Sequence, residues 1–351
     1  TPGTGADADH VPVAPARLLV TRSGADTIDG TLASGGRRSA GQVTTVGVRG
    51  RGGVPSTASA VAVTVTAVRP AAQVFVTLFP CDADQPTTSS LNAAPGSIIA
   101  NTALVALSSD GDLCVFTSAP VDLIVDVTAY VDGFGGIEPI VPVRLADTRP
   151  GESTIDGRGE GTGRLRGGEV LTVDVAGRSV IGGDVAAVAV GVIAVRSTGP
   201  GFLTMFPCDE DRPVASMANT RGGDVVSNSA VVSLSSDGTL CVFSSVDTHV
   251  VLDVTATFES APEFEPLVPA RLLETRPGAM TVDDLGAPSA TVSAGAVTTI
   301  PVAGRGGVDA NAGAVAVTAT AVRSAGRGFV TLFACDDDQP LASSLYMAGG
   351  D

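Results

Sequence analysis

The sequence has no lysine and no tryptophan, only two tyrosines and two histidines, and no apolar run that could cross a membrane. Without lysine, the Lys–Asn isopeptide crosslinks that rigidify some pilus domains are excluded. Aromatic residues make up 4% of the chain, so it lacks the ring platforms on which most carbohydrate-binding modules stack sugars. A bilayer-spanning helix needs about 20 apolar residues, so no membrane span is expected.

The charge balance is strongly acidic. Twenty-one arginines face 37 acidic residues, for a net charge of −16. A chain of this charge repels nucleic acid and anionic membrane surfaces, so neither is an expected partner. The composition is rich in Val and Ala, with 43 Gly and 22 Pro, which favours a folded, turn-rich β protein.

One motif occurs three times at a constant spacing. RLLVTRSG begins at Arg17, RLADTRPG at Arg144 and RLLETRPG at Arg271, and 144 − 17 = 271 − 144 = 127. Other segments return at the same offset, so the repeating unit has the size of a whole domain. We interpret residues 1–10 as a leader, 11–137 as repeat 1, 138–264 as repeat 2 and 265–351 as repeat 3. Repeat 3 is incomplete, and truncation explains it more simply than a strand donated by a partner. The short junctions with Pro and Glu predict stiff connectors and a row of separate domains.

Within a repeat the apolar residues alternate. In AVAVTVTAV, the valines Val61, Val63 and Val65 share one face, as expected for a β-strand. Asp-Gly turns and prolines separate seven or eight such segments per repeat. The sequence therefore predicts an all-β protein of tandem β-sandwiches, of jelly-roll or immunoglobulin-like type.

The cysteines repeat with the domains. Cys81 and Cys114 are 33 residues apart, as are Cys208 and Cys241, and the partner of Cys335 would fall past the last residue. We expect one disulfide per complete repeat, and hence an extracellular or cell-surface location. A free thiol pair or a metal site is the alternative.

The opening motif carries two arginines in every repeat. Strict alternation would place Arg17, Leu19 and Thr21 on one face and Leu18, Val20 and Arg22 on the other. One arginine of each motif is expected to fork onto a buried carboxylate in a structural role, and a grip on an acidic glycan is the alternative. The residues assigned to this repeated structural set are Arg17, Arg22, Arg144, Arg149, Arg271, Arg276, Asp126 and Asp253.

Two further features could bind a ligand. The turns CDADQP, CDEDRP and CDDDQP place carboxylates two residues apart, as at Asp82 and Asp84, which is compatible with calcium or with a structural acidic turn. Arginines in Gly-rich turns, which could cradle an anion, also repeat. They are Arg51, Arg178 and Arg305.

For catalysis the inventory is poor. Neither His10 nor His249 recurs, and no Ser–His–Asp set or zinc-type cluster is present. We therefore expect no enzyme activity and no cofactor.

The repeated segments together resemble a module found in tandem in secreted actinobacterial proteins. The resemblance lies in RLLETRPG, in the VAGRGGV turn that begins at Val302, in AVAVTVTAV and in LIVDVTAY, and it covers essentially the whole chain. It implies an exported, modular protein without catalytic residues. The cysteine pair departs from the plain pattern of that module.

These observations predict a noncatalytic extracellular structural protein that forms a stalk, filament or surface-layer component. Its main expected partner is itself, through end-to-end or lateral assembly. The alternative is an adhesin or an array of glycan-binding modules that gains avidity from repetition on surface glycans.

Overall fold

A computed structural model describes residues 10–132, 136–213, 215–223, 225–259, 265, 267–286, 291–340 and 344–347. Over these residues the chain is built of β-strands and turns, with no helix, which confirms the predicted all-β class. The described part therefore contains no helix that could cross a membrane. Residues 1–9 of the expected leader lie outside the described ranges, as do residues 133–135, 260–264 and 266 of the junctions.

Repeat 1 is a sandwich of two four-stranded antiparallel sheets. The strand order is β1-β8-β3-β6 in the first sheet and β2-β7-β4-β5 in the second. Eight strands shared in this way are the arrangement of a jelly roll rather than of a seven-stranded immunoglobulin domain. The strands are β1 (His10–Val20), β2 (Gln42–Gly47), β3 (Ala58–Val68), β4 (Val74–Pro80), β5 (Leu91–Ala93), β6 (Ile98–Ala106), β7 (Asp112–Thr117) and β8 (Asp122–Asp132).

Repeat 2 has the same topology. Its sheets are β9-β16-β11-β14 and β10-β15-β12-β13, so each strand of repeat 1 has a counterpart. The first strands, β1 and β9, begin at residues 10 and 137, which are 127 apart. The strands are β9 (Ile137–Asp147), β10 (Val170–Asp174), β11 (Val185–Val195), β12 (Pro200–Pro207), β13 (Ala218–Arg221), β14 (Val225–Ser233), β15 (Thr239–Ser244) and β16 (His249–Glu259).

The core of each sandwich lies between its two sheets. In repeat 1 the valines Val61, Val63 and Val65 of β3 are fully buried, and they pack in one cluster with Leu78 of β4 and Leu113 of β7. Repeat 2 has a matching cluster. At about 25 cal/mol per Å² of apolar surface, such burial is the main stabilising contribution to each sandwich.

The opening motif departs from strict alternation. The pairing of β1 with β8 shifts between Arg17 and Leu19, which marks a β-bulge. As a result Leu18 and Leu19 are both fully buried in the core cluster of repeat 1, and the prediction that they lie on opposite faces of the strand is wrong. The bulge inserts one extra residue and thereby re-aims the side chains on either side of it.

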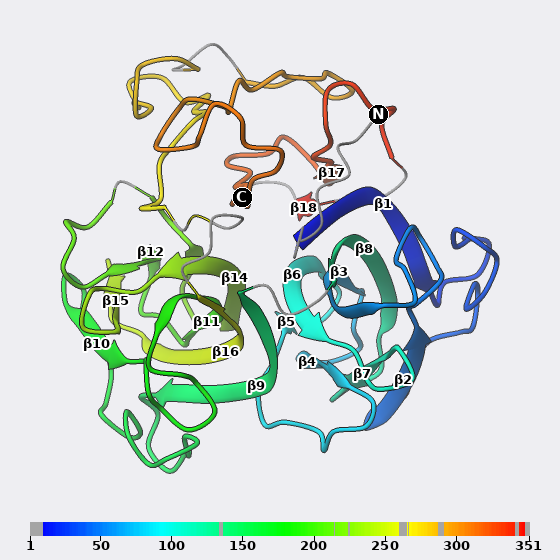
Figure 1. Cartoon of the computed structure of the whole chain (residues 1–351), viewed down its shortest axis with the longest axis horizontal. Coiled ribbons are helices and arrows are strands. Elements are labelled where there is room, and N and C mark those ends of the chain that lie inside the picture. Colours follow the sequence, from blue (N-terminus) through cyan, green and yellow to red (C-terminus); the bar gives the residue numbers. More distant parts are fainter. Residues whose placement is uncertain are drawn as a thin grey trace.

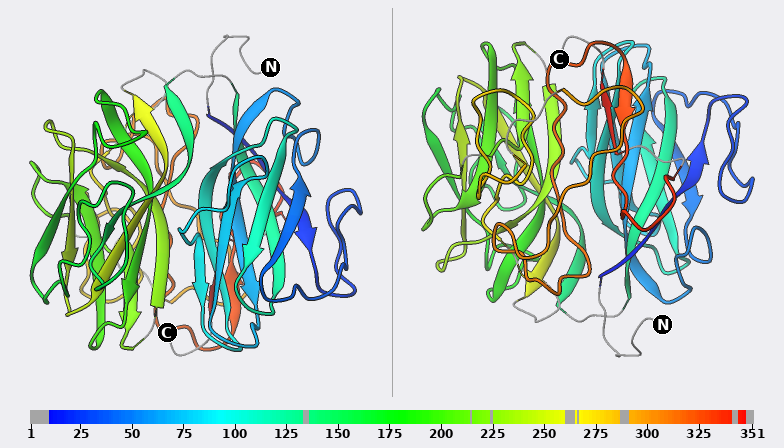
Figure 2. Two further views of the ribbon diagram at one scale, coloured as in Figure 1. Left: turned by 90° about the horizontal axis from the view of Figure 1, so that it is seen from below. Right: turned by 90° about the horizontal axis from the view of Figure 1, so that it is seen from above.

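Repeats 1 and 2 pack directly against each other (Figure 2). Their first sheets face one another across an apolar cluster that we call the inter-repeat cluster. The parts of these two sheets that meet carry alanines and larger apolar residues, and burial of this apolar surface favours the contact. The prediction of a row of separate domains is therefore wrong. The cluster consists of Ala60, Leu104, Val131, Ile137, Ala187, Ala189, Ala256 and Phe258.

Repeat 3 lies beside both other repeats, so that the three surround a common centre (Figure 1). Its described strands are β17 (Gly328–Val330) and β18 (Leu345–Met347), which pair with each other. Strand β18 corresponds to β5, because 345 − 91 is twice 127. It lies against β6 of repeat 1, just as β5 lies against β14 of repeat 2. Repeat 3 also contacts repeat 2, where Thr318 Oγ1 donates a hydrogen bond to Met217 Sδ at 4.0 Å. Repeat 3 thus contacts repeat 1 in the same way as repeat 1 contacts repeat 2, and it contacts repeat 2 through Thr318 and Met217.

Repeat 3 exposes valines whose counterparts are buried. Val315 and Val317 are 43% and 54% exposed, whereas Val61 and Val63 of repeat 1 are fully buried. Counterparts of β6, β7 and β8 would start at position 352, which is 98 plus 254, and the sequence given ends at 351. The described residues of repeat 3 include no strand that covers these valines.

Candidate functional site

Each complete repeat carries a disulfide on its second sheet. Cys81 follows β4 and is bonded to Cys114 of β7, and Cys208 follows β12 and is bonded to Cys241 of β15. Cys335 has an exposed free thiol. Thus the four cysteines with a partner 33 residues away are all bonded, and the disulfides join neighbouring strands of one sheet.

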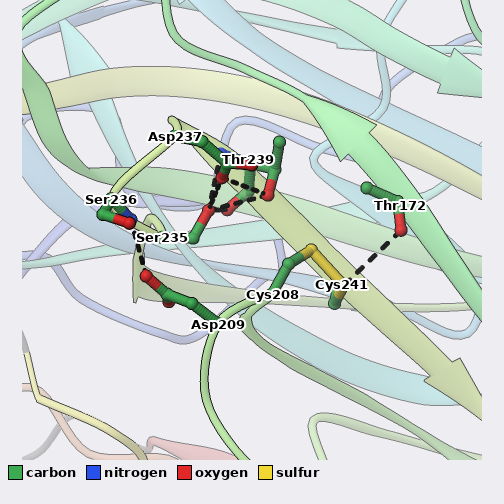
Figure 3. The surroundings of a disulfide bond; sticks show 8 residues. All are labelled: Thr172, Cys208, Asp209, Ser235, Ser236, Asp237, Thr239 and Cys241. Atoms are coloured by element: carbon green, nitrogen blue, oxygen red, sulfur yellow. Dashed lines mark hydrogen bonds between the residues drawn. A yellow bond between two sulfur atoms is a disulfide. The ribbon is translucent and has the colours of Figure 1, made fainter.

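The acidic turn next to each disulfide is bonded to the loop that connects the two sheets of its repeat, as Figure 3 shows for repeat 2. Asp209 accepts a hydrogen bond from Ser236 N at 2.8 Å, and Asp82 accepts one from Ser109 N at 2.7 Å. These backbone donors lower the pKa of both aspartates. Asp237 in the same loop is held by the hydroxyls of Ser235 and Thr239 at 2.5 and 2.9 Å. The carboxylates are therefore engaged in fixing the loop, which favours the structural interpretation of this turn over a calcium site.

The first arginine of the motif forks onto a buried aspartate in repeats 1 and 2, whereas Arg271 of repeat 3 donates to Glu274 at 3.3 Å. Arg17 bonds Asp126 at 2.8 and 3.2 Å, and Arg144 bonds Asp253 at 2.8 and 3.1 Å. In each pair the two residues lie directly opposite one another on neighbouring strands, next to a β-bulge. Burial raises the pKa of Asp253, while the fork with Arg144 opposes that shift.

The second arginine behaves differently in the three repeats. In repeat 2, Arg149 donates to Asp147 through Nε at 2.9 Å and Nη2 at 2.6 Å. In repeat 3, Arg276 donates to Glu274 at 3.0 and 2.7 Å, and Arg276 lowers the pKa of Glu274 to about 2.

In repeat 1 the position of that carboxylate is occupied by Val20, which is fully buried beside Ile124 and Val68. Arg22 is exposed and has no ion-pair partner within the described ranges. It is therefore an uncompensated charge at a position where the other two repeats hold a compensated one.

The arginines in the Gly-rich turns hold the fold together from within. Arg51 donates to Asp29 at 2.6 and 2.9 Å and to the carbonyl oxygens of Gly47, Leu18 and Thr31 at 2.6, 2.9 and 3.2 Å. The side chain is 12% exposed.

The other two repeats contain the same clamp. Arg178 is bound to Asp156 and to three carbonyl oxygens, and Arg305 to Asp283 and to three. Their side chains are 2% and 7% exposed. The guanidinium groups of Arg51, Arg178 and Arg305 donate to these acceptors within their own repeats. The three arginines therefore form structural clamps rather than anion-binding sites.

The contact between repeats also contains polar bonds that the sequence did not indicate. Asn101 of β6 bonds Ser229 of β14 through both ends of its amide, at 3.0 and 3.2 Å. Asn92 N donates to Ser227 Oγ at 3.1 Å. These bonds lie between edge strands of adjacent repeats, and the pairing follows only from the three-dimensional arrangement.

His249 has a structural partner. Its Nδ1 lies 3.1 Å from Thr148 Oγ1, and burial together with the charge of Arg164 lowers its pKa. In repeat 1 the same position is Asp122, which accepts from Thr21 Oγ1 at 3.0 Å. Within the described ranges, no three His, Cys, Asp or Glu side chains gather as a metal site would require.

Comparisons with known proteins give little. The sequence matches no known protein family and no curated protein.

Among solved structures, the tandem CBM22-1–CBM22-2 domain of Xyn10C from Paenibacillus barcinonensis is similar at 16% identity, with 70% of this chain and 98% of that chain covered and a TM-score of 0.19. An IolB-like protein from Salmonella typhimurium LT2 has 13% identity, coverage of 63% and 81%, and a TM-score of 0.19. YhhW from Escherichia coli has 8% identity, coverage of 67% and 95%, and a TM-score of 0.16. At these TM-scores none of the three similarities bears on the function of this chain.

Proposed function

We propose that the chain is a noncatalytic, extracellular structural protein in which three repeats form one block of a stalk, filament or surface layer. The observation that carries this proposal is the inter-repeat cluster, in which two jelly rolls bury Phe258, Leu104 and their neighbours between them. Burying one Phe or Leu side chain contributes about 1.5–3 kcal/mol, so the cluster joins the repeats firmly. A block of this kind transmits load as one body.

The extracellular location is argued from the disulfides. Cys81–Cys114 and Cys208–Cys241 each close a loop of 33 residues. A disulfide over such a loop stabilises a domain by about 3–4 kcal/mol on the chain-entropy model, and bonds of this kind persist in oxidising surroundings. They would keep the block folded without help from other proteins.

The noncatalytic character is argued from the use of the charged residues. The repeated arginines and carboxylates bond one another in forks and clamps inside each repeat, as Arg144 does with Asp253 and Arg178 with Asp156. Groups bonded in this way are not available to transfer protons or bind a substrate. Each set also recurs in more than one repeat, which suits a structural unit better than a single active site.

Assembly between chains has to use other surfaces than the contacts between repeats. The strand contacts of β5 with β14 and of β18 with β6 are already made within one chain. The purified full-length chain is expected to form regular oligomers with rising concentration, seen by light scattering and by negative-stain electron microscopy. A chain that remains monomeric at every concentration would contradict the assembly role. Reduction of the disulfides should disperse the assemblies, because it weakens each block.

The glycan-binding alternative needs charged residues that face outward. Arg51, Arg178 and Arg305 do not meet that need, because the clamp occupies their guanidinium groups. A groove in repeat 1 does meet it, and this feature alone keeps the alternative as a second candidate.

A further inference from the structure

Repeat 1 has an open polar groove beside its opening motif. The groove has a volume of about 560 Å³, which is within the usual range for sites of small ligands. The second half of the motif, residues 21–24, lines it. Two of the lining residues, Gly24 and Gly36, have a left-handed backbone, with φ of 72° and 79°. It is lined by Thr21, Arg22, Ser23, Gly24, Ala25, Ser34, Gly36, Arg37 and Asp122.

Two guanidinium groups and one carboxylate line this groove. Asp122 accepts from Arg37 Nε at 3.4 Å and from Thr21 Oγ1 at 3.0 Å, so Arg37 and Asp122 compensate one another. Arg22 remains as the surplus positive charge, with no ion-pair partner within the described ranges. The chain has a net charge of −16, so the charge of this site is opposite in sign to that of the whole chain.

The other repeats have neutralised the same position. Asp147 accepts from Arg149, and Glu274 accepts from Arg276, in each case by two side-chain hydrogen bonds. Repeat 1 has Val20 in place of the acid. It also has Ser23 where the others have Pro150 and Pro277, and this change adds a backbone N–H and a hydroxyl. Both differences make repeat 1 more favourable to an anion.

We propose that this groove of repeat 1 binds an oxyanion group, a carboxylate or sulfate, with Arg22 as its principal contact. A guanidinium group offers paired donors that match the planar carboxylate and the oxygens of a sulfate. The acidic sugars of extracellular glycans carry both groups, and free inorganic sulfate is the other source of the same chemistry. This site goes beyond the structural role proposed above and does not depend on whether the chain assembles.

Binding is tested by calorimetric titration of the full-length chain with four probes. They are a hexuronate oligosaccharide, a sulfated oligosaccharide, a neutral oligosaccharide of equal length, and sodium sulfate. The acidic probes should bind, the neutral one should not, and affinity should fall with added salt because the contact is a surface charge pair. Binding of sodium sulfate as tight as that of the acidic sugars assigns the groove to free anions. Tighter binding of an oligosaccharide assigns it to a glycan.

Two variants locate the site. Arg22→Gln removes an exposed side chain and should lower the affinity about tenfold or more, since one charge-assisted hydrogen bond has that effect. Val20→Asp should lower the affinity as strongly. It places a carboxylate beside Arg22, as Asp147 lies beside Arg149 in repeat 2. If Val20→Asp fails to fold, Arg22→Gln alone decides.

The corresponding positions of repeat 2 provide matched controls. In repeat 1, Arg37→Gln should weaken binding. Arg164→Gln, its counterpart in repeat 2, should not. Arg149→Gln should also leave binding unchanged. The proposal is overturned if none of the acidic probes binds, or if the repeat 2 variants weaken binding as much as those in repeat 1. Oligomer size, measured on the same samples, should be unaffected by Arg22→Gln, so a failure of this proposal is separable from a failure of the assembly role.

Discussion

The amide side chain of Asn101 in repeat 1 bonds Ser229 of repeat 2 at both of its ends. Asn101 Nδ2 donates to Ser229 Oγ at 3.0 Å, and Asn101 Oδ1 accepts from Ser229 N at 3.2 Å. The same Nδ2 also donates to the carbonyl oxygen of Ser90 at 2.7 Å within repeat 1. Asn101 is 5% exposed, so these bonds lie out of water and the residue connects two domains through one planar group.

Asn101→Ala should therefore weaken the contact between repeats. Asn228 is its counterpart in repeat 2, where Nδ2 donates to Met217 O at 2.5 Å. Both alanine variants lose the internal bond, but only Asn101→Ala loses the two bonds to Ser229. At about 1 kcal/mol per hydrogen bond, we expect Asn101→Ala to lower the free energy of unfolding by about 1–2 kcal/mol more than Asn228→Ala. Denaturant unfolding measures both, and equal losses would show that the contact adds no stability.

Thiol titration should separate the cysteines into two classes. The native chain is expected to react with Ellman's reagent at a single site, Cys335, because its thiol is exposed and the other four cysteines are bonded in pairs. Unfolding without reductant should leave that number unchanged, and reduction should raise it to all five cysteines of the sequence. More than one reactive thiol before reduction would contradict the disulfide assignment.

Removal of one disulfide should destabilise its own repeat. The double variant Cys208→Ser with Cys241→Ser reopens a loop of 33 residues. On the chain-entropy model the expected loss is about 3–4 kcal/mol, measured by denaturant unfolding. Cys335→Ser is the matched control and should change the free energy of unfolding little, since its side chain bonds no other cysteine.

The clamp of Arg178 predicts a specific dependence on acid. Arg178 and a second arginine, Arg158, depress the pKa of Asp156 well below its usual value of 3.8. A group with a depressed folded-state pKa stabilises the fold above its unfolded pKa, and this contribution is lost as the pH falls through the folded-state value. The wild-type chain should therefore hold this contribution at pH 5 and lose it progressively below about pH 4.

Asp156→Asn should remove that contribution at every pH. Arg178 is 2% exposed and would lose the charged partner that it has among the described residues, so we expect a loss of roughly 2–3 kcal/mol at pH 7, and a shallower decline below pH 4. The control is Asp184→Asn, at an exposed turn position with no ion pair in the described part of the chain. Equal effects of the two variants on the acid unfolding curve would contradict the role of the clamp.

The fold class could be predicted because apolar residues alternate along the β-strands, and this alternation is visible in the sequence. Val61, Val63 and Val65 alternate in the sequence and are all fully buried in β3. The β-bulge at Leu18 and Leu19 could not be predicted, since both residues are equally apolar and nothing local marks the extra residue. Burial of both follows from pairing with β8, more than 100 residues away in sequence.

The arrangement of the repeats was hidden for a different reason. Ala60 and Ala187 lie on the outer faces of their sheets, and an alanine there fits water as well as a neighbouring domain. The sequence therefore predicted separate domains, because nothing in it indicates that these alanines pack against another repeat. The unpaired charge of Arg22 did leave a local signal, namely Val20 in place of Asp147 and Glu274, but its meaning depends on the forks seen in the other repeats.

The closed ring of repeats is tested most directly by small-angle X-ray scattering of the full-length chain. A compact protein of 351 residues has a radius of gyration of roughly 20 Å. The three repeats placed in a row, each with the radius of gyration that this scaling gives for its length, would have roughly 30 Å. We predict the smaller value, unchanged between low and high salt because the inter-repeat cluster is apolar. A value near the larger one would contradict the ring and restore the row of separate domains.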